Sequence, residues 1–217
     1  MSQNDQLQQA VLAELWWDPS VTAAHIGVTA DAGVVSLTGH VDSLMEKLAA
    51  EAAAQRVKGV KAVVEEIEVR LPFDATRTDG DIAAAVIDRL AWDVSVPRDV
   101  IKVKVESGWV TLSGEVKWQF QRAAAAADAH KLFGVRGVSN QITIRPAIDA
   151  SLLSDDITHA LHRSWFFDPL AVTVTVEGGT VRLAGTVRTP HERQLAGSTA
   201  WSASGVTDVI NEIEVED

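Results

Sequence analysis

The sequence predicts an α+β protein built from three tandem α-β-β-α-β units. Three observations lead to this prediction. The motif G-x-V-x-L-x-G-x-V occurs three times, starting at Gly33, Gly108 and Gly179. Apolar residues recur at helical spacing before each motif, and they alternate with polar residues around it. Each unit is therefore expected to fold into a three-stranded mixed sheet with two helices on one face.

A helix is expected at the start of each unit. In the first copy Leu7, Val11 and Leu15 are four residues apart, which places them on one helical face. The helix should end at an aromatic residue that is followed by aspartate. We expect this aromatic residue to pack in the core or at the helix end, and the aspartate to turn the chain rather than bind a ligand. The three pairs are Trp17-Asp18, Trp92-Asp93 and Phe167-Asp168.

A β-hairpin should follow, and then a second helix and a third strand. Ile101, Val103 and Val105 alternate with lysines, as expected of a half-buried strand, and Ser107-Gly108 is a turn sequence. In the first copy, residues 42–58 are rich in Ala, Leu, Glu and Lys and predict a helix that ends at Gly59. The last strand should cover residues 62–69 and pair in parallel, because a β-α-β crossover connects it to the hairpin.

Corresponding positions of the copies define the domain boundaries. They lie 75 residues apart, although the third copy is four residues shorter before its hairpin. The predicted domains are residues 1–72, 77–147 and 151–217.

Composition excludes several functions. The chain has 217 residues, 30 acidic and 19 basic side chains, a formal charge of −11 and no cysteine. A general nucleic-acid binder is not expected, because that affinity comes mostly from neutralising phosphates. Disulfides and thiolate chemistry are excluded. The N-terminus has no apolar signal-like segment, and no run of about 20 apolar residues is present, so we expect a cytoplasmic protein without a transmembrane segment.

Catalytic side chains are not arranged in a repeated pattern. None of the six histidines occupies the same repeat position in all three copies, and Ser36 and Ser113 have no matching histidine. Asp155, Asp156 and His159 lie close together in sequence, but a solvated helix start explains them. We therefore expect no enzyme activity, no metal site and no cofactor.

The middle copy differs from its neighbours in charge. Residues 1–75 have 11 acidic and 5 basic side chains, residues 76–148 have 8 and 10, and residues 149–217 have 11 and 4. The middle copy also has Trp or Phe at three positions where the other copies have neither. The candidate binding residues are accordingly Lys102, Lys104, Trp109, Lys117, Trp118, Phe120 and Arg122.

Two interpretations of these residues remain open. Aromatic rings beside basic side chains suit the interface of an anionic phospholipid bilayer. Alternatively, Trp109 and Trp118 pack against a neighbouring copy. The expected partner is an anionic phospholipid surface or another protein. An interaction scaffold and a soluble ion or small-ligand sensor are the alternative functions.

The repeated unit resembles the BON domain (bacterial OsmY and nodulation). The resemblance rests on the α-β-β-α-β order, on G-x-V-x-L-x-G-x-V, on the Ala-rich second helix and on the Gly-Val pair that precedes the last strand, as in Gly59-Val60. It implies a bacterial, non-enzymatic module of stress-related, transport-associated proteins that binds phospholipid surfaces or partner proteins. It also implies a periplasmic location as the alternative to the cytoplasm.

Overall fold

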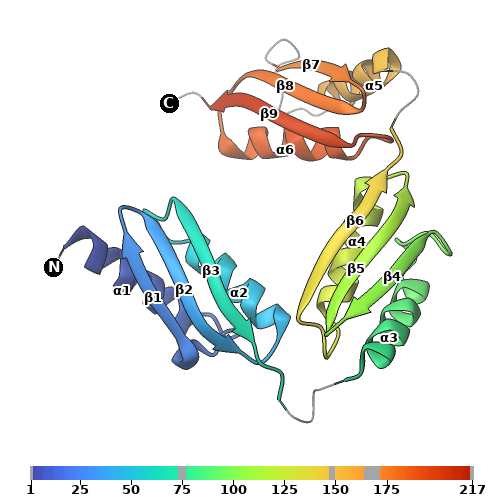
Figure 1. Cartoon of the computed structure of the whole chain (residues 1–217). Helices are drawn as coiled ribbons and strands as arrows, with labels where there is room; N and C mark the ends of the chain where they lie inside the picture. Colours follow the sequence, from blue (N-terminus) through green and yellow to red (C-terminus); the bar gives the residue numbers. More distant parts are fainter. Residues whose placement is uncertain (1, 73–76, 147–149, 164–171, 216–217) are drawn as a thin grey trace. The chain divides into compact units, whose positions relative to one another are not determined.

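The structure, a computed structural model, describes residues 2–72, 77–146, 150–163 and 172–215. Each unit has the order α-β-β-α-β (Figure 1). The first unit comprises α1 (Gln3–Trp17), η1 (Ala23–His25), β1 (Ile26–Asp31), β2 (Val34–Val41), α2 (Leu44–Gln55) and β3 (Ala62–Val69). The second comprises α3 (Asp79–Trp92), β4 (Ile101–Glu106), β5 (Trp109–Val116), α4 (Gln119–His130) and β6 (Gly137–Ile144). The third comprises α5 (Ala150–His162), β7 (Val172–Glu177), β8 (Thr180–Val187), α6 (Pro190–Trp201) and β9 (Asp208–Val215).

The three sheets share one topology. Their strand orders are β1-β2-β3, β4-β5-β6 and β7-β8-β9. In the first unit β1 and β2 are antiparallel, with Ile26 opposite Gly39, and β2 and β3 are parallel, with Val34 beside Ala62. The third unit repeats both pairings. The predicted fold class, with a three-stranded mixed sheet in each unit, is confirmed. The domain boundaries remain predictions.

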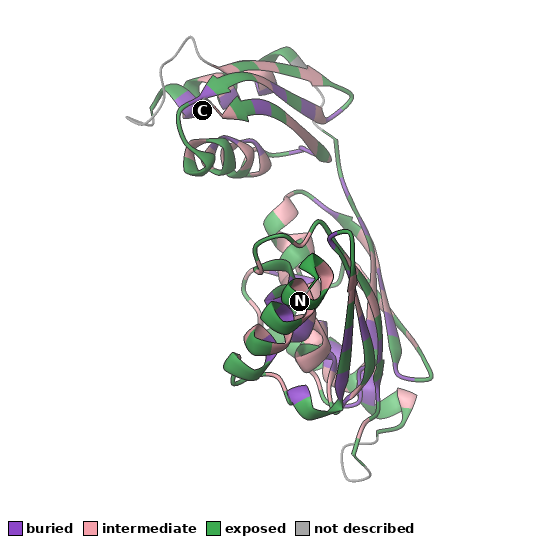
Figure 2. Cartoon of the chain, turned by 90° about the vertical axis from the view of Figure 1, so that its left-hand side faces the viewer, coloured by how far each residue is buried: buried purple, intermediate pink, exposed green. Residues whose placement is uncertain are grey.

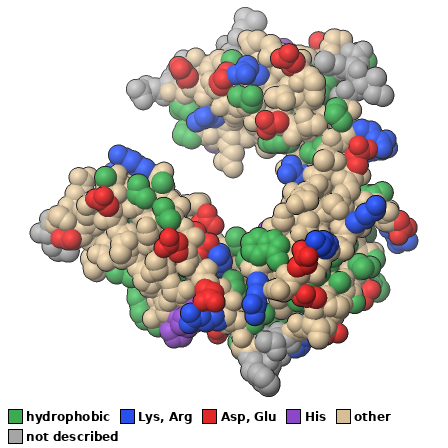
Figure 3. All heavy atoms as spheres, viewed as in Figure 1, with side chains coloured by type: hydrophobic (Ala, Val, Ile, Leu, Met, Phe, Trp, Pro, Cys, Tyr) green, Lys and Arg blue, Asp and Glu red, His purple; other side chains and the backbone are tan. Residues whose placement is uncertain are grey.

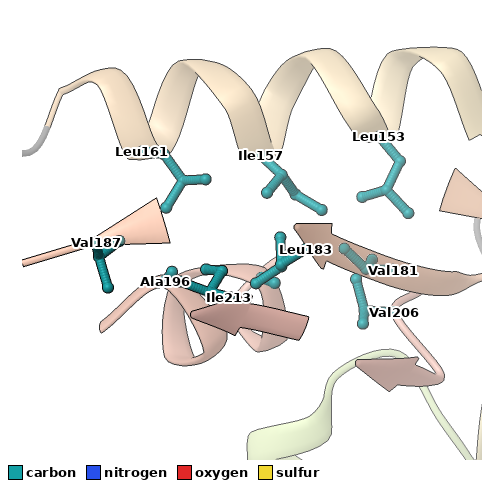
Figure 4. Close-up of a cluster of buried hydrophobic side chains, with 10 residues drawn as sticks. Leu153, Ile157, Leu161, Val181, Leu183, Val187, Ala196, Val206 and Ile213 are labelled. Carbon is teal, nitrogen blue, oxygen red and sulfur yellow. The ribbon is translucent and has the colours of Figure 1, made fainter. Parts of the chain in front are cut away.

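Each core lies between the helices and one face of the sheet. In the third unit Leu153, Ile157 and Leu161 of α5 point toward Leu183 of β8 and Ile213 of β9 (Figure 4). Along the strands, buried residues alternate with exposed ones (Figure 2). The opposite face of the sheet is left to solvent, and that face carries the polar half of each strand.

Two glycine positions explain the repeated motif. The hairpin turns Ala32-Gly33, Ser107-Gly108 and Gly178-Gly179 have positive φ at both residues, as a type I′ turn requires. The second motif glycine also has positive φ, which is 118° at Gly39. A Cβ atom on Gly39 would lie 2.0 Å from the carbonyl oxygen of His25, the residue that directly precedes β1, so a side chain does not fit there. The motif therefore encodes a tight hairpin with one close backbone approach at the start of its first strand.

Helix ends follow the local sequence. Ser2 and Asp5 form a capping box at α1, and Thr189 and Glu192 form another at α6. Helix α2 is shorter than the predicted 42–58, because Ser43 caps its start and Arg56 its end. Gly59 has a φ of 99°, as expected for a residue that ends a helical segment. The short η1 helix was not predicted.

Candidate functional site

The two lysines of β4 lie on the solvent side of the middle unit. Lys102 and Lys104 are exposed, whereas the intervening Val103 is half-buried. Lys104 forms an ion pair with Glu106 over 2.8 Å, but both side chains are largely exposed. Such a surface pair contributes little to stability. Both ammonium groups are thus accessible from solvent, as the alternation along the strand predicts.

Trp109 lies on the open face of the middle sheet. It is the first residue of β5, and its side chain is 53% exposed. Its indole rests against Gly137, the first residue of β6, because a Cβ atom there would lie 2.3 Å from ring atom Cζ3. The ring therefore has a support within its own unit, and more than half of it still faces water.

The remaining candidates lie at the start of α4. The Gln121 side-chain oxygen accepts hydrogen bonds from the backbone N–H groups of Lys117 and Trp118, at 3.1 and 3.2 Å. This arrangement fixes the entry to the helix. The rings of Trp118 and Phe120 are brought together, with centroids 6.3 Å apart and planes inclined at 34°. Phe120 is 55% exposed, Lys117 is exposed and Arg122 is half-buried.

The tryptophans at the ends of the first helices are the main correction to the sequence-based predictions. Trp17 and Trp92 were expected to pack, but they are 83% and 85% exposed. Phe167 lies outside the described residues. Each tryptophan follows a buried leucine, Leu15 or Leu90, by two positions. Two residues correspond to about 200° around a helix, so the rings point away from the core.

This helical spacing was the signal that the sequence reading missed. The neighbouring Trp16 and Val94 are exposed as well. An apolar tip therefore lies at the end of α1, and another at the end of α3.

The aspartates after these helices turn the chain, as predicted. The Asp18 carboxylate accepts hydrogen bonds from the N–H and O–H of Ser20, and Asp93 accepts one from the Ser95 N–H at 2.7 Å. Asp18 also pairs with Arg56 over 2.9 Å. The Ser20 hydroxyl and the Arg56 guanidinium lower the pKa of Asp18 to about 2. Asp168 lies outside the described residues.

Helix α4 of the middle unit contains a buried carboxylate. Asp128 is almost completely buried, and its Oδ1 accepts a hydrogen bond from the Arg89 Nε at 2.9 Å. Among the described residues, its Oδ2 has no hydrogen-bond partner. The corresponding residue of the first unit is Ala53, also buried. The Arg89–Asp128 ion pair therefore links α3 and α4 in the middle unit, whereas the first unit has apolar packing at the position of Asp128.

Within the described ranges, no group of three or more His, Cys, Asp or Glu side chains is arranged to hold a metal ion. The helices in the same ranges include none with the length and hydropathy to cross a bilayer.

Comparison with known proteins identifies the repeat. The family model described as BON domain matches residues 3–70, 78–146 and 149–217. Osmotically-inducible protein Y of Escherichia coli (strain K12) is 31% identical over 155 residues, which cover 64% of this chain and 73% of that protein. CdsD is a structural protein of the Type III secretion system of Chlamydia trachomatis. The alignment with one solved CdsD structure spans 97% of this chain and 92% of the CdsD chain, with 17% identity and a TM-score of 0.29. A second, of the CdsD C-terminal domain, is 18% identical and covers both chains completely, with a TM-score of 0.28. The three family matches cover almost the whole sequence, and this chain therefore belongs to the BON domain family and contains three copies of the domain in tandem.

Proposed function

We propose that the chain is a non-catalytic binding protein that attaches to anionic phospholipid surfaces through its middle unit. The observation that carries the proposal is the exposure of large apolar rings, Trp92 and Trp109 above all, on the unit with excess positive charge. Figure 3 shows Lys and Arg side chains distributed over this unit. Exposed apolar patches on soluble domains often mark sites that bind membranes or other proteins.

The two kinds of side chain would act together at a bilayer interface. Tryptophan is favoured at headgroup level, where its ring meets an apolar phase and its N–H remains hydrated. Removing a large apolar side chain from water stabilises the bound state by about 1.5–3 kcal/mol. Each basic side chain near an anionic surface adds about 1 kcal/mol. Lys102 and Lys104 are exposed and can therefore reach lipid headgroups. Lys117 is also exposed, beside the Trp118–Phe120 ring pair.

The relatives support a biological setting for this activity. Osmotically-inducible protein Y is named for its response to osmotic conditions, and we propose a related stress role for this chain. A phospholipid surface is available in the periplasm, which the family resemblance favours, as well as in the cytoplasm.

Vesicle co-sedimentation tests the proposal. The full chain should sediment with vesicles that contain phosphatidylglycerol and not with vesicles of phosphatidylcholine alone, and binding should weaken as salt increases. Replacing both β4 lysines, as in Lys102→Glu with Lys104→Glu, should weaken binding strongly. Absence of binding to any anionic vesicle would refute the proposal. Capture of a protein partner without lipid dependence would instead favour the interaction scaffold.

Trp92→Ala and Trp17→Ala form a matched pair of variants. The two residues occupy the same repeat position and are almost equally exposed, but they belong to units of different charge. Trp92→Ala should reduce vesicle binding, by about tenfold or more for a loss above 1.4 kcal/mol. Trp17→Ala should have little effect. An equal loss in both variants would contradict the assignment to the middle unit.

A further inference from the structure

Two histidine side chains stack on the surface of the first unit. The imidazole centroids of His25 and His40 are 4.7 Å apart, and the ring planes are inclined at 13°. Figure 3 shows histidine atoms exposed on this unit. The copies diverge here: the corresponding residues are Val100 and Glu115 in the second copy, and Ala171 and Thr186 in the third. The pair is therefore a feature of the first unit and not of the repeat.

Strand register builds this pair. Ile26, the first residue of β1, is opposite Gly39 in the antiparallel ladder, so His25 at the end of η1 lies just beyond the ladder beside His40 of β2. In β2 Val41 is buried, which directs the preceding His40 to the open face of the sheet, and the ring of His25 stacks on it there. Facing side chains on adjacent strands have Cβ atoms about 4.5–5.5 Å apart. Because Gly39 allows the close approach of the His25 backbone, the main chain itself holds the two rings side by side.

The surroundings of the pair are acidic. Glu68 of β3 is beside His40 in the parallel ladder, and Glu66 is beside Thr38 on the same open face. Arg70 forms an ion pair with Glu68 over 2.8 Å, which balances one of these charges. His25 is exposed and His40 half-buried, so an ion from solvent has access to both rings. A cation thus meets a favourable field at this face of the sheet.

We propose that His25 and His40 together bind one divalent transition-metal ion of the Zn²⁺ class. Imidazole nitrogen is a preferred ligand for zinc, copper and nickel and a poor one for magnesium. Rotation about the Cβ–Cγ bonds, a torsion with broad minima, turns one nitrogen of each ring toward a shared ion at about 2.0–2.1 Å. Water completes the coordination, because the protein supplies two ligands. Such an open site exchanges its ion with solvent.

Calorimetric titration of the untagged full chain with ZnCl₂ tests the proposal. The wild type should bind Zn²⁺ at a site that MgCl₂ does not occupy. His25→Gln and His40→Gln should each weaken binding as much as the double variant does, because chelation needs both rings and the two effects are not additive. Both side chains are on the surface, and circular dichroism checks that the variants remain folded.

A double variant of α5, His159→Gln with His162→Gln, is the matched control, because these histidines are three residues apart on one helix. It should bind Zn²⁺ like the wild type. In ¹H–¹⁵N spectra of the imidazole groups, the His25 and His40 signals should shift first on addition of Zn²⁺. The proposal is overturned if Zn²⁺ does not bind up to millimolar concentration, if binding survives in His25→Gln, or if the α5 variant abolishes it. None of these results depends on whether the chain binds lipid.

Discussion

Replacement of Gly39 by alanine should destabilise the first unit far more than the same replacement at Gly59. Both glycines have positive φ, 118° and 99°, so both substitutions strain the backbone. They differ in the space around the new methyl group. At Gly39 it would lie 2.0 Å from the His25 carbonyl oxygen, whereas at Gly59 its nearest neighbour is a methyl group of Leu7 at 3.6 Å.

The structure gives the size of the difference. Left-handed backbone costs about 1–2 kcal/mol for a residue with a Cβ atom, and this is the whole expected cost of Gly59→Ala. At Gly39 the His25 carbonyl, directly before β1, must also retreat by about 1.4 Å to reach an ordinary contact of 3.4 Å. A hydrogen bond stretched that far is lost, and two lost bonds of the β1–β2 ladder add about 2 kcal/mol. A unit of this size has a total stability of only about 3.5–10 kcal/mol.

Hydrogen–deuterium exchange measures this effect within each unit. The amides of β1 and β2 should exchange about 30-fold faster in Gly39→Ala than in Gly59→Ala, which corresponds to the extra 2 kcal/mol. Exchange in β7 and β8 serves as an internal reference, because the third unit has its own core. Equal exchange in the two variants would refute the steric explanation of the second motif glycine.

Two further predictions concern charged groups. The Asp18 carboxyl should titrate near pH 2 by NMR, and Ser20→Ala should raise its pKa more than Arg56→Gln, since the Ser20 hydroxyl is the largest cause of the shift. Because the folded pKa is below the ordinary 3.8, this interaction stabilises the first unit above about pH 4, and the stabilisation is lost as the pH falls through 2. In the middle unit Arg89→Ala should destabilise by about 3 kcal/mol in denaturant unfolding, because it leaves Asp128 buried without its partner. Adding Asp128→Ala should recover most of the lost stability, because the first unit has a buried alanine, Ala53, at the same repeat position. A double variant as unstable as Arg89→Ala would contradict this account.

Sequence periodicity was sufficient to predict the fold. Spacings of four and of two residues gave the helices and strands, and three copies of one motif fixed their order. Local rules also gave the solvent-facing side of Lys102 and Lys104 and the turns at Asp18 and Asp93, because each depends on residues within one element. A repeated pattern is strong information since the same physical constraints act on every copy.

Which side chains meet, and which remain exposed, depended on how the helices and strands pack together. Recurrence of Trp17 and Trp92 at one repeat position suggested packing, but their direction around the helix leaves them in solvent. His25 and His40 are 15 residues apart in the chain, and the β1–β2 register brings their rings together. Trp109 rests on Gly137 of another strand. The physical reason is that periodicity specifies the face on which a residue lies, whereas contacts between elements depend on strand register and backbone approach, which the folded chain sets as a whole.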